Sequence, residues 1–243
     1  MSTNRTLAIA TRIISQMLRD HRSLALIFVV PIVVMSLVGF SFADQRGILD
    51  RVAPALIGVF AFFFTFILTG VSFLRERSQG TLERLLTTPV GRGDILVGYL
   101  LGFLLFAAIQ SGVILLFTIL ALQVDYQGSL WQIFVLLMVL TVVAVNLGIF
   151  ISTFARNEFQ VVQFIPLVLA PQVFLSGVIL PVEDMPGYLQ AIARVLPLTY
   201  AVEGLQDIML RGQTLSDVGQ ELAVLAGLAV ALLALAAATV RRT

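Results

Sequence analysis

The run RERSQGTLERLLTTPVGR, residues 75–92, is the only long charged and polar stretch in the first half of an otherwise apolar chain. Gly80 interrupts whatever precedes it, and Thr81 is a good N-cap for a new helix. Glu83 falls in the first turn, where the helix dipole favours an anion. Pro89 ends the helix, because the residue before a proline avoids helical geometry. The pattern predicts a two-turn helix over residues 81–88.

This short helix, which also contains Arg84, is amphipathic, since Leu82, Leu85 and Leu86 lie on one face. Its apolar stripe is too small for a stable isolated helix, so it must be buried against something. The helix could pack on lipid headgroups or on the protein's own spans, which would give it a structural role only. It could instead fit into a cleft of a partner protein, which would give it a functional role.

Several kinds of chemistry are missing from the chain. All fifteen basic residues are arginine, and without a lysine the G-x-x-x-x-G-K-[ST] phosphate-binding loop cannot form. There is no cysteine, and the only histidine is His21, so thiolate chemistry, zinc sites and histidine-based triads are excluded. The arginines are scattered among loops, which gives no indication of nucleic-acid binding. We therefore expect no catalytic set, metal or cofactor in this chain.

The composition is that of an integral membrane protein. Hydrophobic residues make up 59% of the 243 residues, charged residues 12%, and the mean hydropathy is +1.01. A soluble domain carries about 25% charged residues. Because a membrane span needs about 20 apolar residues, six runs qualify. They are residues 24–42, 53–74, 95–122, 130–154, 161–182 and 222–240. We predict a single all-α transmembrane domain over residues 1–243.

Arginine placement predicts the orientation in the membrane. With the N-terminus in the cytoplasm, eleven arginines fall in inside segments and four, Arg46, Arg51, Arg194 and Arg211, fall outside. The positive-inside rule then places both termini and the 75–92 loop in the cytoplasm of a multi-pass protein of the cell membrane.

Two further segments are predicted to lie at the membrane surfaces. Before the first span, Leu7, Ala10, Ile14, Met17 and Leu18 recur every three or four residues, and Arg5, Arg12 and Arg19 recur every seven. This pattern favours an interfacial amphipathic helix within residues 1–22, with its arginines among lipid phosphates. A plain extension of the first span is the alternative. Residues 183–220 are half apolar and broken by prolines, which favours short helices on or dipping into the outer face.

The six span cores hold no Asp, Glu or Arg, which argues against a proton-driven transporter and a charged channel. The polar residues within them are neutral. Hydrogen bonds between helices are their plain interpretation, and a polar substrate path is the other. The candidates for that path are Gln110, Asn146, Gln163, Gln172 and Ser176. Gly98 and Gly102 in the third span permit close helix packing.

The stretch LRERSQGTLERLLTTPVGRGDILVGYLLG resembles the signature segment of type-2 ABC (ATP-binding cassette) exporter permeases, the drug- and lipid-export class that includes daunorubicin-resistance permeases. The later stretch FLSGVILPVEDMPGYLQAIARVLPLTYAVEGLQDIMLRG resembles the segment after that family's fifth span. The six-span layout and the N-terminal helix also fit, so the resemblance covers nearly the whole chain.

The resemblance implies a fold and partners. Such permeases form homodimers or heterodimers, and each half engages a cytoplasmic ATPase subunit that binds ATP and Mg²⁺. Residues 81–86, Thr81 to Leu86, would form the coupling helix that enters the ATPase, and Glu76 and Glu83 match acidic positions of the family. The N-terminal arginine-bearing helix would be the connecting helix, and residues 183–220 the extracellular re-entrant segment.

Three functions remain open at this point. The first is export of a hydrophobic or amphipathic compound, such as a drug or a lipid. The second is export of a polysaccharide or lipid-linked glycan, for which Phe60, Phe62, Phe63, Phe64 and Phe66 could stack on sugars, although packing explains them as well. The third is a membrane scaffold that uses the loop helix to recruit a partner without transport.

Overall fold

The computed structural model describes residues 3–42, 44–81, 85, 87 and 90–240. Within these ranges every regular element is a helix, which confirms the all-α prediction. The long helices are α2 (His21–Ser41), α3 (Arg46–Ser78), α5 (Arg92–Leu120), α6 (Leu130–Ser152) and α10 (Gly219–Val240). All five are long and apolar enough to cross a membrane over most of their length.

The predicted fifth span is shorter than expected. Helix α7 (Glu158–Leu175) ends well before residue 182, and its apolar part, Phe159–Leu175, falls short of the length of the other five. Ser176 closes the helix and Gly177 adopts a φ of 82°, which a residue with a side chain rarely adopts. The chain thereby turns into the short helix η1 (Val182–Asp184).

Helix α3 is longer than its predicted span at both ends. Its 33 residues extend over about 50 Å at 1.5 Å per residue, which exceeds the roughly 30 Å hydrocarbon layer. The surplus turns carry Arg46 and Arg51 at one end and Arg75 and Arg77 at the other. The helix therefore holds its charges beyond the apolar layer and continues through residues that read as loop in the sequence.

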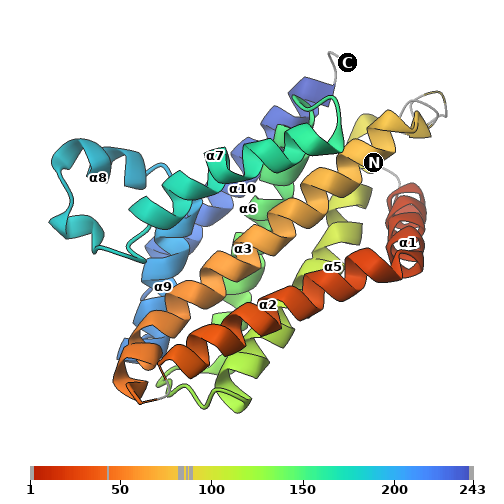
Figure 1. Cartoon of the computed structure of the whole chain (residues 1–243). Helices are drawn as coiled ribbons and strands as arrows, with labels where there is room; N and C mark the ends of the chain where they lie inside the picture. The colour runs from red at the N-terminus through yellow and green to blue at the C-terminus, as the bar shows by residue number, and fades with distance from the viewer. Residues whose placement is uncertain (1–2, 43, 82–84, 86, 88–89, 241–243) are drawn as a thin grey trace.

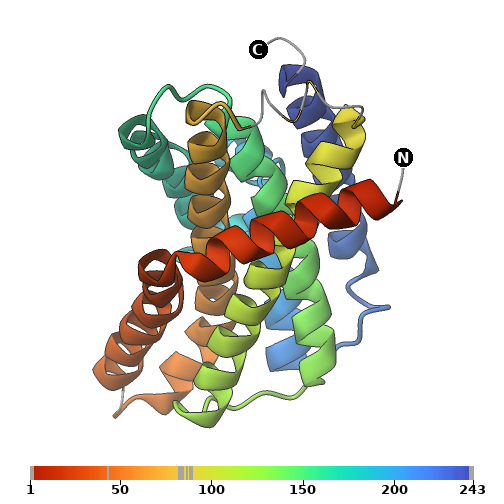
Figure 2. The same cartoon turned by 90° about the vertical axis from the view of Figure 1, so that its right-hand side faces the viewer.

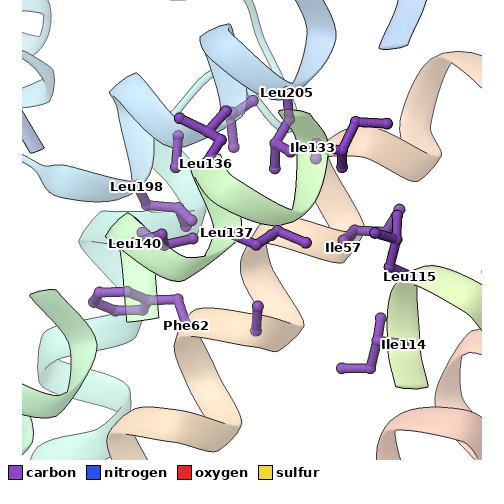
Figure 3. Close-up of a cluster of buried hydrophobic side chains, with 14 of the residues drawn as sticks. Ile57, Phe62, Ile114, Leu115, Ile133, Leu136, Leu137, Leu140, Leu198 and Leu205 are labelled. Atoms are coloured by element: carbon purple, nitrogen blue, oxygen red, sulfur yellow. The ribbon is translucent and has the colours of Figure 1, made fainter. Parts of the chain in front are cut away.

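Helix α6 lies at the centre of the bundle and packs against α3, α5, α9 (Pro197–Arg211) and α10. Figure 3 shows the core at this place, where Leu136, Leu137 and Leu140 of α6 meet Ile57 and Phe62 of α3 and Leu198 and Leu205 of α9. Each of these side chains is buried. Helix α9 is thus part of the core, although it reads as an outer surface segment in the sequence.

Helix α1 (Thr3–Arg19) crosses the bundle instead of running along it, and lies against α5 (Figure 2). Figure 2 also shows the start of α1 and the end of α10 toward the same end of the bundle as the end of α3 and the start of α5. We call this the terminal end. The hairpin of η1 and α8 (Gly187–Ala193) projects beside α9 toward the other end (Figure 1).

Candidate functional site

Three consecutive charged residues, Arg75, Glu76 and Arg77, end helix α3 at the terminal end. Each contacts a different part of the bundle, and we call this group the junction. Arg75 Nη1 lies 3.2 Å from Asp20 Oδ2. Asp20 is the N-cap of α2, where its carboxylate accepts hydrogen bonds from the Ser23 amide at 3.2 Å and the Ser23 hydroxyl at 2.7 Å. Arg75 therefore joins α3 to the corner between α1 and α2.

The Asp20 carboxylate is stabilised in its charged form. The Ser23 hydroxyl and amide hydrogen bonds lower the pKa of Asp20 below its ordinary value, burial opposes them in part, and Arg75 adds a smaller lowering effect. The corner therefore keeps its negative charge at neutral pH.

Glu76 is the buried centre of the junction, with only 2% of its surface exposed. Its Oε2 lies 2.5 Å from Arg12 Nη2 of α1 and accepts a hydrogen bond from the Tyr99 hydroxyl of α5 at 2.8 Å. A buried carboxylate must be paired, because desolvation without a partner is costly. Glu76 therefore fixes α1 and α5 to the end of α3.

Arg77 binds the end of the central helix. Its Nη1 donates to the carbonyl oxygens of Ser152 at 3.2 Å and Thr153 at 2.9 Å. These are terminal carbonyls of α6, which have no partner within the helix, and a cation there also complements the helix dipole. Through the junction, one turn of α3 thus contacts α1, α2, α5 and α6.

The predicted coupling helix follows the junction directly. Gly80 adopts a φ of 68°, which confirms the predicted break after α3. Thr81 and Leu85 are helical, and the Leu85 side chain packs against the cluster that contains Ile9, Ile95 and Tyr99. Leu82, Glu83, Arg84 and Leu86, together with Thr88 and Pro89, lie outside the described residues. Their role remains a prediction.

Helix α1 rests on the two glycines of α5. A Cβ at Gly98 would lie 2.7 Å from Ile9 Cβ, and one at Gly102 would lie 2.9 Å from Ile13 Cβ. The backbone of α1 therefore lies close to α5 because these two positions have no side chain.

The face by which α1 docks on the bundle coincides only in part with the predicted apolar stripe, since Ala10 and Met17 belong to both. The buried residues are Thr6, Ile9, Ala10, Ile13 and Met17. Leu7 and Leu18, which belong to the predicted apolar stripe, are about half exposed. Of the three arginines, Arg12 turns toward Glu76, whereas Arg5 and Arg19 are exposed. The helix is confirmed, and its place at the membrane surface stays a prediction.

The polar residues proposed for a substrate path lie in separate places. Gln110 accepts from the Thr65 hydroxyl at 3.4 Å, and Asn146 donates to the Ala229 carbonyl of α10 at 2.9 Å. Gln172 accepts from the Leu198 amide at 3.1 Å and so caps the start of α9. Three of the five therefore join helices within one chain. Gln163 is exposed on α7, and the buried Ser176 lines a hollow at the other end of the bundle.

The phenylalanine cluster of α3 is mainly a packing element. Phe62 and Phe66 are fully buried and stack on each other with ring centroids 6.4 Å apart. Phe64 is also buried, while Phe60 and Phe63 are partly buried against the core. The described residues contain no group of three or more acidic or histidine side chains that could hold a metal.

Sequence reasoning missed Asp20, Tyr99 and the pairing of Arg77. The sequence did contain one indication of these contacts. Three charged residues follow directly on an apolar span, and burying a charge without a partner is energetically costly, so each of them requires a partner. The identity of those partners depends on residues 23 to 76 positions away and could not be read from spacing.

Comparisons with known proteins agree with this architecture. A family model described as ABC-2 type transporter matches residues 4–210. The chain is 31% identical over 164 residues to ABC transporter G family member 20 of Dictyostelium discoideum. The aligned region covers 68% of this chain and 22% of that protein. It is 30% identical over 171 residues to the probable multidrug ABC transporter permease YbhR of Escherichia coli (70% of this chain, 46% of that protein).

A third relative is the linearmycin resistance permease protein LnrN of Bacillus subtilis. It is 31% identical over 147 residues, which is 60% of this chain and 38% of that protein. In all three cases the matched region spans less than half of the relative's own length.

Proposed function

Because the chain belongs to the ABC-2 type transporter family, we propose that it is the membrane-spanning permease subunit of an ATP-driven exporter. ATP and Mg²⁺ would be bound by a separate cytoplasmic ABC ATPase, since this chain has no lysine for a phosphate-binding loop. Two permeases would pair, as a homodimer or with a related chain. The active assembly would lie in the cell membrane with both termini of this chain in the cytoplasm.

The observation that carries the proposal is the junction. The predicted coupling helix at residues 81–88 begins three residues after α3 ends, and α3 ends in side chains that bind α1, α2, α5 and α6. A force applied to residues 81–88 by an ATPase would therefore act on several spans at once. Packed helices transmit such displacements because they have few alternative arrangements.

We infer the substrate class from the interior of the spans and from the names of the relatives. Apart from Glu76 at the end of α3 and Asp94 in the first turn of α5, the side chains that the described spans bury are apolar or neutral polar. A hydrophobic or amphipathic compound suits that lining. The names of two relatives, a multidrug permease and a linearmycin resistance permease, support the same class. The buried phenylalanines do not favour sugar stacking, so we retain glycan export only as the alternative.

The test is ATP-driven transport by the purified assembly. The chain would be isolated from its native membrane with its associated ATPase and reconstituted in vesicles with ATP outside. Accumulation of a fluorescent amphipathic dye in the lumen would then be measured. We expect ATP-dependent uptake, and we expect Glu83→Ala with Leu85→Ala to abolish both uptake and stimulation of the ATPase.

Gly227→Ala in α10 is the matched control, because nothing lies within 4 Å of the position of its added Cβ. Normal coupling in the Glu83 and Leu85 variant, at normal expression, would refute the role of residues 81–88. An assembly that hydrolyses no ATP and moves no dye would instead favour the membrane scaffold.

A further inference from the structure

A second polar site lies at the end of the bundle away from the junction. It is a hollow of about 490 Å³ between the start of α3, the end of α7, η1, α9 and the start of α10. Figure 1 shows the end of α7 and helix α9 beside the segment that carries α8. We call it the acidic hollow. Its charged lining residues are Glu183, Glu203, Asp207 and Glu221, with Arg51 and Arg211.

The charges of this lining do not balance. Arg211 forms an ion pair with Asp207 one helical turn away, which neutralises that carboxylate. Glu183, Glu203 and Glu221 then face a single further lining arginine, Arg51. Burial raises the pKa of Glu203 above its ordinary value, and the neighbouring Glu221, Asp207 and Glu183 raise it further, against a smaller effect of Arg194. The hollow is therefore short of positive charge.

Two lining atoms are also buried without a hydrogen bond. The Ser176 side chain is 0% exposed, and its hydroxyl has no partner within the described part of the chain. Oε2 of Glu221 is likewise buried and has no hydrogen-bond partner among the described residues. Glu221 also lies close to α9 beside Glu203, because its Cβ is 3.7 Å from the place where a Cβ on Gly204 would be. Buried polar atoms are normally satisfied, so these two point to a ligand that supplies donors.

The donors required are those of an organic cation and not of a metal ion. The carboxylates do not come close enough together to form a metal site among the described residues. A primary ammonium group, by contrast, carries three donors and one charge on a flexible stem. Apolar surface is adjacent as well, since Ile179 and Leu180 are exposed and directly precede Pro181 of the lining.

We propose that the acidic hollow binds the ammonium group of an amphipathic amine, with Glu203 and Glu221 as its acceptors and Ser176 as a further contact. The inference rests on the proposed export function, under which this end of the bundle is the one away from the ATPase. The ammonium could belong to a free amine or to an aminophospholipid headgroup.

The test measures binding directly, without ATP. The full-length chain in dodecyl maltoside would be titrated with monodansylcadaverine and with its N-acetyl derivative, which lacks the charge, and binding followed by fluorescence anisotropy. We expect only the charged probe to bind specifically. Glu203→Gln and Glu221→Gln should each weaken it by about tenfold, the effect of one lost hydrogen bond to a charged group.

The matched control is Asp184→Asn, an exposed acid next to Glu183 that does not line the hollow and should leave binding unchanged. Wild-type binding should weaken as the pH falls through the raised pKa of Glu203, and Glu203→Gln should lose that part of the dependence. Competition by added phosphatidylethanolamine would identify a lipid headgroup as the ligand, and its absence would identify the free amine. Either result supports the site.

Equal binding of both probes by the wild-type chain, or unchanged binding by both glutamine variants, would overturn the proposal. The probe comparison decides the question even if one variant fails to fold. Charge-selective binding in an assembly that moves no dye with ATP would refute the export function alone. ATP-driven dye uptake without charge-selective binding would refute the acidic hollow alone.

Discussion

At the scale of single residues, the terminal end depends on one buried carboxylate. Glu76 has a partner in α1 and another in α5, and its Oε1 has none among the described residues. A buried ion pair adds little net stability compared with an apolar pair, but removing one partner leaves an uncompensated charge. Glu76 therefore specifies how α1 and α5 sit on α3 more than it strengthens the fold.

Arg12→Met should destabilise the chain by about 2–3 kcal/mol, below the usual cost of breaking a buried pair because Arg12 stays partly exposed. The double variant Arg12→Met, Glu76→Met should regain most of that loss, since no charge is then left buried. Tyr99→Phe should cost about 1 kcal/mol. Thermal unfolding in detergent micelles measures all three, and additive effects of Arg12→Met and Glu76→Met would contradict the pairing.

For Glu203 we expect that replacing the acid stabilises the chain at neutral pH, in contrast to the loss expected at Arg12. The reason is that burial raises the pKa of Glu203 in the folded state. The folded chain then binds the Glu203 proton more tightly than the unfolded chain does. Its contribution to stability is full below the ordinary glutamate pKa of about 4.3 and is lost as the pH rises through the raised value. Glu203→Gln should thus raise the melting temperature at neutral pH and give no gain in acid. Parallel melting profiles for the two chains across pH would contradict this.

At the scale of elements, α1 is positioned by the surface of α5. Ile9 and Ile13 occupy the space left by Gly98 and Gly102, so the two helices cross at close range. The cluster that includes Ile9, Ile13, Tyr99 and Phe103 then joins this crossing to the junction. A change in the docking of α1 should therefore affect coupling as well as stability.

Gly98→Val should separate α1 from α5, because even its Cβ would lie 2.7 Å from Ile9 and 3.0 Å from the Thr6 carbonyl oxygen. Overpacking of this kind costs about 1–3 kcal/mol. We expect a lower melting temperature and weaker stimulation of the partner ATPase. Gly227→Ala, a change within an equally apolar helix but into open space, should alter neither. A Gly98 variant that matches this control would show that α1 does not depend on the glycines.

The helices themselves could be predicted from the sequence, but their contacts could not. The period of Arg5, Arg12 and Arg19 predicted helix α1. Its docking face could not be chosen, because Ile9 and Ile13 are as apolar as Ile14 and Leu18, and the glycines that decide lie some 90 residues away. The ends of α3 were missed for a related reason. The charged residues at both ends of α3 were interpreted as loop. A helix that is longer than the hydrocarbon layer can nevertheless carry charged residues in its terminal turns.

In the candidate sites, too, local structure could be predicted from the sequence and contacts between distant residues could not. The break at Gly80 and the helical state of Thr81 and Leu85 follow from local rules of capping and turn geometry, and the structure agrees. The acidic hollow could not be predicted, because Glu183, Glu203 and Glu221 belong to three elements that meet only in the folded chain. Neither their shared negative charge nor their spacing in the sequence indicated that they lie together.

At the scale of the whole molecule, the two polar sites lie at opposite ends of one apolar bundle. The junction, Thr81 and Leu85 lie at the terminal end, and the acidic hollow lies where α3, α9 and α10 begin or end at the other. The proposed mechanism requires the terminal end to face the ATP of the cytoplasm. The distribution of arginines predicts that orientation, eleven against four.

The absence of cysteine makes the orientation directly testable, since any introduced cysteine is the only thiol in the chain. Ser78→Cys reports on the terminal end, whereas Gln45→Cys and Ser129→Cys report on the other, and all three positions are exposed. In intact cells, a membrane-impermeant maleimide should label Gln45→Cys and Ser129→Cys, and it should reach Ser78→Cys only after permeabilisation. Neither Gln45 nor Ser129 makes a side-chain cap bond, so these two changes should not disturb the fold. Labelling of Ser78→Cys alone in intact cells would place residues 81–88 outside, where no cytoplasmic ATPase could reach them, and would refute the proposed function.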